Sequence, residues 1–266
     1  INSIKDKTWV YTLNCQVPNG GNLPDGITRI AAAIEYDGSD YCGWQRQNHS
    51  PSVQAEVEKA FSVVGDEVIS IVCAGRTDTG VHGTNQIVHF DTCAKRSSRQ
   101  WLLGVNANLP KGVRVHWTEE KAAQFHARFS ATARTYRYII SNQFYRSALY
   151  HRLLTWERIH LDEELMEVAA QKLLGEHDFT SFRAAGCQSL SPNRDVHSVK
   201  VWRESQFVIF EIIANSFLHH MVRNIVGSLI SIGRREKEPE WLGSLLKDCD
   251  RSKASSTAPS GRRSLG

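Results

Sequence analysis

Residues 68–91 read VISIVCAGRTDTGVHGTNQIVHFD, which is two apolar stretches separated by a glycine-rich turn. Residues 68–73 and 86–91 are rich in β-branched residues, so each predicts a strand, and the residues between them predict a loop. Such a loop displays Asp78 after the end of a strand, where functional groups are commonly found. Arg76 lies two residues before it. The stretch therefore predicts a carboxylate presented on a loop beside a cation.

Three interpretations of Asp78 follow from this pattern. Aspartate in a glycine-rich turn often bonds only to the nearby backbone. Residues 78–80, Asp-Thr-Gly, also suggest an aspartic protease, but that chemistry needs two carboxylates and the chain has no second such triplet, so only a homodimer could supply the pair. In the third interpretation, Asp78 is a single carboxylate acting on RNA, which Arg76 would hold in its charged form.

Composition narrows the class of protein. The chain has 266 residues, of which 41% are hydrophobic and 23% charged, as in globular proteins of one or two domains. No apolar run approaches the ~20 residues that span a bilayer, and the first 25 residues lack the apolar segment of a secretory signal. We therefore expect a cytoplasmic protein without membrane contact. The six cysteines form no C-x-x-C pair, which predicts free, buried thiols and no metal site.

One long window of the sequence contains no acidic residue. Residues 121–156 include six lysines and arginines but no Asp or Glu, and aromatic side chains are interleaved with the cations. A solvated basic face is one explanation. Cations for phosphates and flat rings for bases are also the pattern of a nucleic-acid surface, so this window favours an RNA-acting protein.

Hydrophobic periodicity predicts an α+β fold in two halves. In each half, strands of alternating or continuous apolar residues are followed by amphipathic helices, and neighbouring strands are close in sequence, which favours antiparallel sheets. The expected strands lie at 27–36, 112–118, 132–141, 195–203 and 207–214, and the expected helices follow Pro51, lie at 99–107, 162–174 and 238–247, and end near Gly233.

Six segments resemble the tRNA pseudouridine synthase A family and occur in the family's order. They are EYDGSDYCGWQRQ (35–47), AGRTDTGVHG (74–83), VNANLP (105–110), FHARFSATARTYRYII (125–140), GEHDFTSFRA (175–184) and NSFLHHMVRNIVGSLI (215–230). The resemblance implies the pseudouridine synthase fold, with two similar α/β halves whose antiparallel sheets join side by side, helices on one face and a basic cleft between. It also implies a homodimeric isomerase that converts uridines 38, 39 and 40 of the tRNA anticodon stem-loop to pseudouridine without cofactor or metal.

The resemblance also implies roles for individual residues. Asp78 would be the essential carboxylate, which either attacks the sugar C1′ or removes a neighbouring sugar proton. Tyr136 would stack on the uracil, Arg76 would assist base flipping, and Arg223 would form a supporting ion pair with Asp78. The further tRNA contacts implied by motif match are Arg96, Phe125, His126, Ala127, Arg128, Phe129, Gly186, Cys187, Gln188, Ser189 and Leu190.

The two ends of the chain depart from the family pattern. We expect residues 1–26 to form a poorly ordered extension, residues 27–141 an N-terminal α/β half with the catalytic loop, and residues 142–250 a C-terminal α/β half. Residues 251–266 would form a tail without the family's usual final strand. This departure leaves a second function open, that of an RNA-binding family member with impaired catalysis.

Overall fold

The computed structural model describes residues 11–15 and 23–260. These residues fall into two compact units, an N-terminal one up to Thr132 and a C-terminal one from Ala133 onward. Strands and helices in both units confirm the α+β class. The boundary precedes the expected position at residue 141, because β6 (Ala131–Asn142) pairs along residues 134–141 with a strand of the C-terminal unit. Within the described ranges, no helix is both long and apolar enough to span a bilayer.

An antiparallel sheet forms the N-terminal unit, with β2 (Thr28–Tyr36) between β4 (Gly83–Thr92) and β5 (Val113–Lys121). The short β3 (Val72–Cys73) also pairs with β4, as does β1 (Tyr11–Cys15), in parallel. Strand β1 lies within residues 1–26, where we expected an irregular extension. The expectation for residues 1–10 and 16–22 falls outside the described residues.

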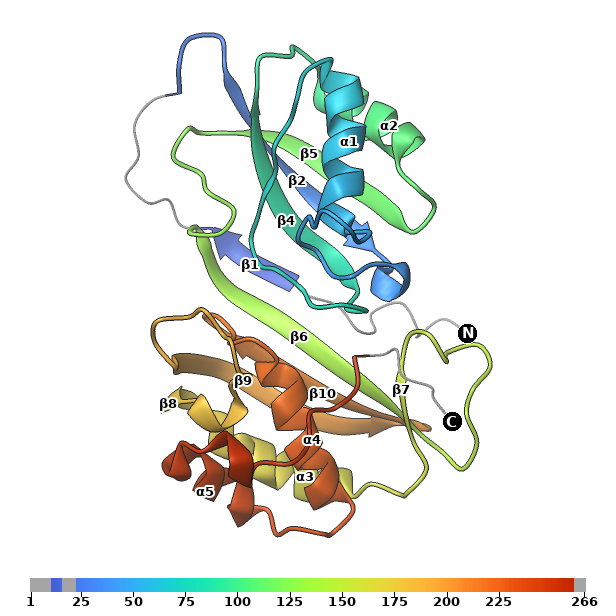
Figure 1. Cartoon of the computed structure of the whole chain (residues 1–266), viewed down its shortest axis with the longest axis vertical. Helices are drawn as coiled ribbons and strands as arrows, with labels where there is room; N and C mark the ends of the chain where they lie inside the picture. Colours follow the sequence, from blue (N-terminus) through green and yellow to red (C-terminus); the bar gives the residue numbers. More distant parts are fainter. Residues whose placement is uncertain (1–10, 16–22, 261–266) are drawn as a thin grey trace. The chain divides into compact units, whose positions relative to one another are not determined.

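Two helices cover one face of this sheet (Figure 1). Helix α1 (Val53–Gly65) follows Pro51 and Ser52, and α2 (Ser98–Asn108) begins with a capping box in which Ser97 and Gln100 satisfy each other's backbone amides. Their apolar stripes pack with alternate residues of β2 and β4 into one core, which includes Phe61, Phe90 and Trp101. The helices thus sit where the 3.6-residue periodicity predicted them.

The strand expected at 68–73 is shortened to two residues. The amide of Ile71 donates to Glu58 Oε1 at 3.0 Å, and the amide of Ile69 donates to Ser62 Oγ at 2.9 Å. Both acceptors are side chains of α1, so these amides are satisfied by the helix instead of by a neighbouring strand. Ile69 and Ile71 are nevertheless buried, as their apolar character predicts.

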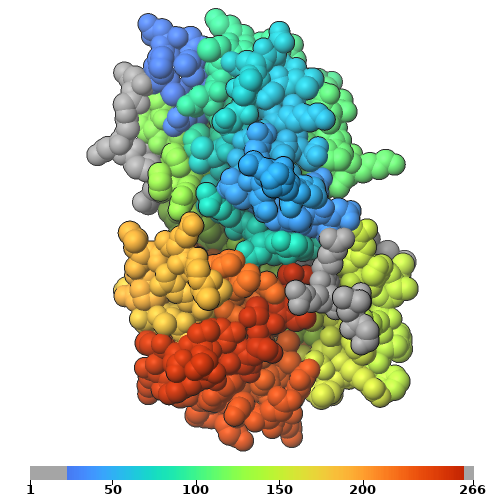
Figure 2. All heavy atoms as spheres, in the orientation of Figure 1, coloured from blue at the N-terminus to red at the C-terminus, as the bar shows by residue number. Residues whose placement is uncertain are grey.

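The C-terminal unit is a second antiparallel sheet, in the order β6, β10 (Phe207–Ala214), β9 (Asn193–Glu204) and β8 (Gly175–Asp178), with β7 (Thr155–Glu157) parallel to β6. Helices α3 (Glu163–Ala170), α4 (Met221–Gly233) and α5 (Glu240–Asp248) cover one face and enclose the main core. In Figure 2, α4 and α5 form the orange and red surface that hides most of these strands.

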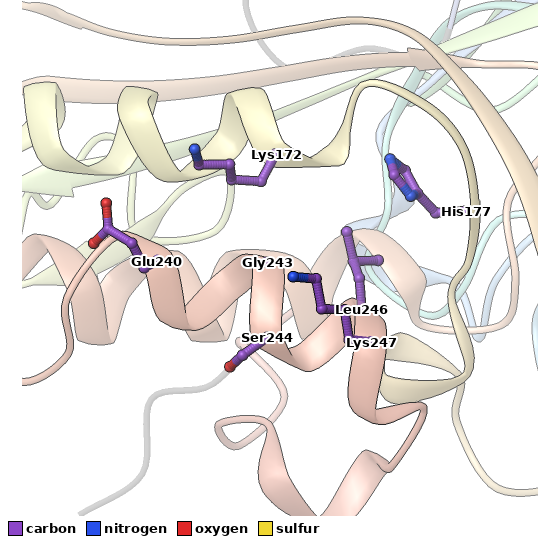
Figure 3. Close-up of a pocket in the computed structure, with 7 residues that line it drawn as sticks. All are labelled: Lys172, His177, Glu240, Gly243, Ser244, Leu246 and Lys247. Carbon is purple, nitrogen blue, oxygen red and sulfur yellow. The ribbon is translucent and has the colours of Figure 1, made fainter.

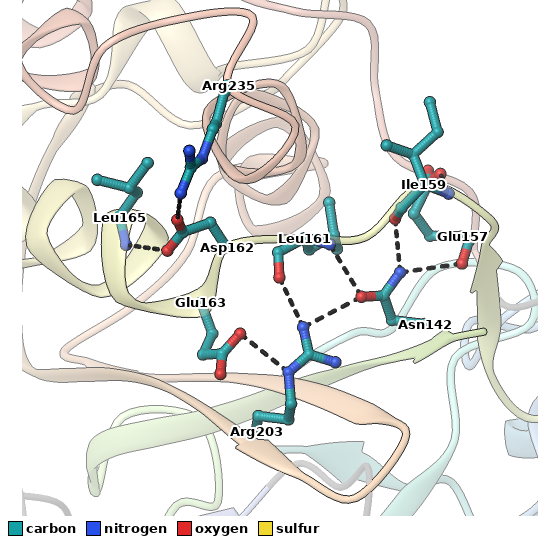
Figure 4. A network of polar contacts seen from close by, with 9 residues as sticks. All are labelled: Asn142, Glu157, Ile159, Leu161, Asp162, Glu163, Leu165, Arg203 and Arg235. Carbon is teal, nitrogen blue, oxygen red and sulfur yellow. Dashed lines mark hydrogen bonds and ion pairs between the residues drawn. The ribbon is translucent and has the colours of Figure 1, made fainter.

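Arg203 of β9 organises the connection between β7 and α3 (Figure 4). Its guanidinium donates to Leu161 O at 2.6 Å, to Asn142 Oδ1 at 3.1 Å and to Glu163 Oε2 at 2.9 Å. Asn142 in turn donates to the carbonyl of Ile159 at 2.6 Å. Because these bonds join β6, β9 and α3, the segment between β7 and α3 is fixed to the sheet.

The segment after α5 packs along α4 without forming a strand in its described part. Residues 251–253 form a short 3₁₀ turn, and the residues up to 260 are irregular. A Cβ at Gly227 of α4 would lie 2.1 Å from Ser256 O, so only glycine allows this approach. The rest of the expected tail, residues 261–266, lies outside the described residues.

Candidate active site

The loop between β3 and β4 carries Asp78, which is half-buried. At its start, the amide of Ala74 donates to Ile87 O at 2.8 Å, and the Gln86 side chain bonds to Gly75 O. At its centre, the amide of Val81 donates to Asp78 O at 3.2 Å and closes a turn. The loop is therefore fixed at its beginning and at the residue that bears the carboxylate.

Residues 36–44, from the end of β2 onward, form a support for the Asp78 loop. Trp44 donates its amide to Thr77 O at 3.1 Å, and the hydroxyl of Tyr36 bonds to Thr77 Oγ1 at 2.8 Å. Trp44 and Tyr36 are both buried and their rings lie 5.6 Å apart. Hydrogen bonds from Trp44 and Tyr36 thus hold Thr77, the residue before Asp78, in place.

Two glycines let this support approach the loop closely. Gly43 has a φ of +96°, and a Cβ there would lie 2.7 Å from Thr77 O and 3.2 Å from the carbonyl carbon of Asp78. A Cβ at Gly38 would lie 2.0 Å from Val81 O. Backbone therefore packs on backbone at either side of Asp78, an arrangement that only glycine permits. The sequence marked residues 35–47 as a segment that resembles the family but assigned them no role; Gly38 and Gly43 were the signal that could have identified it.

Arg76 is exposed and makes no hydrogen bond or ion pair within the described ranges. Burial raises the pKa of the nearby Cys73 thiol to about 11, and the charges of Arg76 and Arg128 oppose that rise. Both arginines therefore lie near the strand that leads into the Asp78 loop. The thiol itself stays protonated at neutral pH and is not a nucleophile.

The predicted contact segment Phe125–Phe129 forms a turn on the sheet face opposite α1 and α2. Phe125 and Ala127 pack with Ala31, Ala33 and Ile87 in a core on that face. Their side chains are buried, so any contact they make with tRNA would involve the backbone. Arg128 is exposed, Phe129 is 67% exposed, and His126 stacks on Phe129 with ring centroids 4.3 Å apart. Only these three side chains of the segment are available to a ligand.

Arg29 of β2 holds this turn in place. It donates two bonds of 2.7 Å to the Asp91 carboxylate, and it donates to Ala123 O at 2.5 Å and Phe125 O at 2.7 Å. His89 adds a further contact, because its Nδ1 accepts the amide of Ala127 at 3.1 Å. Burial, with the Arg29 charge second, lowers the pKa of His89 to about 4. The imidazole is therefore neutral and can act as the acceptor.

Arg96, the remaining predicted contact of this unit, is exposed just before α2. Its guanidinium donates to Lys95 O at 3.2 Å. This single exposed bond leaves the charge accessible to an anion.

Tyr136, in the C-terminal unit, lies on β6 opposite Ile212 of β10 and is half-buried. Its ring packs edge-on against Phe217 at a centroid distance of 4.8 Å. Arg137 points to the other face of the sheet and pairs there with Glu211, as strand alternation predicts. One edge of the Tyr136 ring is thus held by the core.

Tyr138, two residues further along β6, is a packing residue. Its hydroxyl bonds to Thr155 Oγ1 and to Pro259 O, each at 2.6 Å. Burial raises the pKa of Tyr138 to about 12, although the bond to Thr155 and the charge of Arg223 oppose the rise. The hydroxyl thereby joins β6 to the segment after α5.

Residues 186–190 form an exposed loop supported by arginine. Arg183 donates to Cys187 O at 2.7 Å and Ser189 O at 2.8 Å, and Arg194 donates to Ser189 Oγ at 2.7 Å. Burial of Cys187 by itself raises the pKa of its thiol. Hydrogen bonds from the amides of His219 and Ser189 and from the Arg183 side chain outweigh this effect, so the pKa is lowered overall. Three of the predicted tRNA-contact residues in this loop are exposed, namely Gly186, Gln188 and Leu190.

Arg223 lies on α4 and contacts the segment after α5. Its Nε donates to Ala258 O at 2.8 Å, while its own carbonyl accepts the amide of Ala258 at 3.0 Å. This reciprocal pair fixes the position of the arginine along the helix. The ion pair with Asp78 that the resemblance implies joins the two units and remains a prediction.

The cysteines with described side chains are all free, as expected, but they are not buried. Cys93 and Cys249 are exposed and the other three are partly buried. A groove of about 380 Å³ between the end of α3 and α5 contains none of the predicted site residues (Figure 3). It is lined by Lys172, His177, Glu240, Gly243, Ser244, Leu246 and Lys247.

The fold and the Asp78 loop together define an α+β protein with a candidate carboxylate-dependent active site. A sequence model of the family described as tRNA pseudouridine synthase matches residues 32–130 and 169–265. The tRNA pseudouridine synthase A of Shewanella denitrificans is 56% identical over 230 residues, which cover 86% of this chain and 88% of the relative.

Two further relatives agree. The tRNA pseudouridine synthase A of Hydrogenovibrio crunogenus is 53% identical over 233 residues, covering 88% of this chain and 89% of its own length. That of Aliivibrio fischeri is 54% identical over 230 residues, covering 86% and 88%. The chain therefore belongs to the tRNA pseudouridine synthase family, and this membership replaces the aspartic-protease interpretation of Asp78.

Proposed function

We propose that this protein isomerises uridines 38, 39 and 40 in the anticodon stem-loop of tRNA to pseudouridine, with Asp78 as the catalytic carboxylate. Membership of the family supports the reaction class. The observation that carries the proposal is the rigid mounting of Asp78, whose loop is bonded to Tyr36 and Trp44 and packed on two glycines. Such a mounting holds a reactive group in one position relative to the ribose.

In the proposed reaction, the bond between uracil N1 and ribose C1′ breaks and a bond between uracil C5 and C1′ forms. Asp78 either attacks C1′ or takes a neighbouring sugar proton. After the new bond forms, C5 releases its proton to water and N1 takes up a proton from water. The atoms of uridine are conserved, so no oxidant, reductant or cofactor enters the balance.

The remaining residues would hold the RNA. Tyr136 offers a ring face for stacking on the uracil, and base–aromatic stacking contributes about 1–3 kcal/mol per base. Arg76 and Arg96 are exposed cations suited to phosphates, and Arg128 is exposed beside Phe129. We propose that Arg223 pairs with Asp78 and keeps it charged, and that residues 186–190 form a further tRNA contact.

The experiment that tests this proposal maps pseudouridine in an unmodified tRNA transcript by carbodiimide adducts and primer extension. Adducts are expected at positions 38–40. A matched transcript with cytidine at these positions should give none. Adducts elsewhere would refute the anticodon-arm assignment, and tRNA binding without any adduct would refute catalysis.

We further propose a cytoplasmic homodimer, on the basis of the family resemblance. Sedimentation of the purified chain tests the assembly, with a mass of about twice the chain's 30.0 kDa expected. A monomer at the concentrations that support activity would contradict it.

A further inference from the structure

His82 is the residue immediately before β4, and it lies beside the support formed by residues 36–44. The residue is buried, with 6% of its surface exposed. Strand β2 pairs antiparallel with β4, and Tyr36 lies opposite Gly83 where this pairing ends. The next residues outward along the two strands, Asp37 and His82, are therefore neighbours. The strand register thus brings an imidazole ring to the start of the support.

The ring of His82 offers an acceptor to a backbone amide of the support. The amide of Gly38 lies 3.2 Å from Nδ1 and donates a hydrogen bond to it. Gly38 is the first residue of a 3₁₀ turn (Gly38–Asp40), a position whose amide has no partner inside the turn. Gly38 is also buried, so its amide would be left without solvation if no side chain accepted from it. His82 supplies this acceptor.

The carboxylate of Asp37 competes for the same ring atom. Its Oδ1 lies 3.1 Å from Nδ1, close enough to accept a proton from it. An unprotonated Nδ1 accepts from Gly38, whereas a protonated Nδ1 donates to Asp37, so the atom can serve only one of them. The Asp37 side chain is 48% exposed to water, and its Oδ1 already accepts the amide of Ser39 at 2.9 Å. The buried amide of Gly38 needs the ring more, which places the imidazole proton on Nε2.

This hydrogen bond holds the part of the loop that follows Asp78. The bonds to Thr77 described above hold only the residue before it. After Asp78, the amide of Val81 donates to Asp78 O at 3.2 Å, and a Cβ on Gly38 would lie 2.0 Å from Val81 O. Because His82 accepts the amide of the same glycine, it keeps the support and the loop at this short separation. The loop is therefore attached to the support on both sides of the carboxylate.

We propose that His82 is a positioning residue for the reaction, whose unprotonated Nδ1 holds the Asp78 loop on the support so that the carboxylate meets the ribose in one orientation. The inference rests on the proposed function for the role of Asp78. It adds a residue that acts through the position of the loop and that none of the predicted site residues includes. A displacement of about 1 Å in an active site is enough to slow the reaction strongly.

Two substitutions separate the Nδ1 acceptor from the bulk of the ring. His82→Asn places an amide oxygen near the position of Nδ1 and can still accept from Gly38, whereas His82→Leu fills a similar space without an acceptor. His82→Leu should lower kcat for pseudouridine formation at least roughly 10-fold, with the KM for tRNA within about twofold of wild type. His82→Asn should recover most of the lost kcat.

Ser62→Ala is the matched control for loss of stability. It also removes a side-chain acceptor from a backbone amide of the same unit, that of Ile69, but at the end of α1. It should lower the urea midpoint of unfolding and leave kcat unchanged. Equal kcat in wild type and His82→Leu would overturn the proposal. So would an equal loss of kcat in His82→Leu and His82→Asn, because the acceptor would then not matter.

A second measurement uses the wild-type chain and so does not depend on how the variants fold. With ¹⁵N-labelled histidine and glycine, Nδ1 of His82 should show the nitrogen chemical shift of an unprotonated ring atom at neutral pH and a scalar coupling to the amide nitrogen of Gly38. A protonated Nδ1 would overturn the proposal. The His82→Asn spectrum, which lacks this signal, assigns it. A chain with this signature that forms no pseudouridine would refute the proposed function and leave the bond between His82 and Gly38 established.

Discussion

Substitution of Gly43 by alanine should disturb the catalytic loop more than the fold. At a φ of +96°, alanine is strained by about 1–2 kcal/mol relative to glycine. In addition, its Cβ would lie 2.7 Å from Thr77 O, so restoring an ordinary 3.4 Å contact requires a movement of about 0.7 Å. A displacement of 1 Å in an active site can reduce rates about 100-fold, so we expect kcat to fall roughly 10-fold or more.

Gly26 provides the matched control for this prediction. Its φ is +83°, yet a Cβ there would meet nothing within 4 Å. Gly26→Ala should therefore lower the free energy of unfolding by about 1–2 kcal/mol and leave kcat unchanged. Urea denaturation and pseudouridine formation at saturating tRNA measure the two effects. If Gly43→Ala and Gly26→Ala behave alike in both assays, the close packing of Gly43 on the Asp78 loop has no functional role.

Three further substitutions test other contacts. Tyr36→Phe removes the bond to Thr77 and should lower the free energy of unfolding by about 1 kcal/mol. It should also lower kcat, because Thr77 precedes Asp78. A loss of stability with kcat unchanged would contradict the positioning role. Tyr138→Phe removes the bond to Pro259 O and should cost about 1–2 kcal/mol in urea denaturation, and no change would refute the anchor. The pKa of His89 is lowered from 6.5 to about 4, so the unfolded chain takes up this proton first and stability should fall as pH drops from about 6.5 toward 4, by about 1–3 kcal/mol. His89→Asn should flatten this pH dependence, and an unchanged slope would show that another group causes it.

Local patterns predicted most of the regular elements. Strand β10 is a nearly continuous apolar run and is mostly buried, and α4 repeats its apolar residues every three to four positions, so a strand and a helix followed from these patterns. Residues 69–71 failed as a strand because Glu58 and Ser62, from a helix earlier in the chain, take their amides. Contacts between distant segments decided this outcome, and no local window contains them.

The candidate site likewise combines features that the local sequence predicts with features that depend on contacts between distant segments. The loop that presents Asp78 could be predicted because glycine and β-branched residues mark its borders. The burial of Phe125 and Ala127 could not, because it depends on which sheet face the turn covers. The support of the loop by Gly38 and Gly43 depends on backbone atoms that the fold brings to where a Cβ would lie, so the sequence indicates the glycines but not their partners.

Release of tritium from C5 of uracil in labelled tRNA tests whether Asp78 is the catalytic carboxylate, with wild type and Asp78→Asn compared at saturating tRNA. Wild type should release the label, and Asp78→Asn should release it at a rate at least about 100-fold lower, with tRNA binding retained. Equal release by both proteins would contradict it.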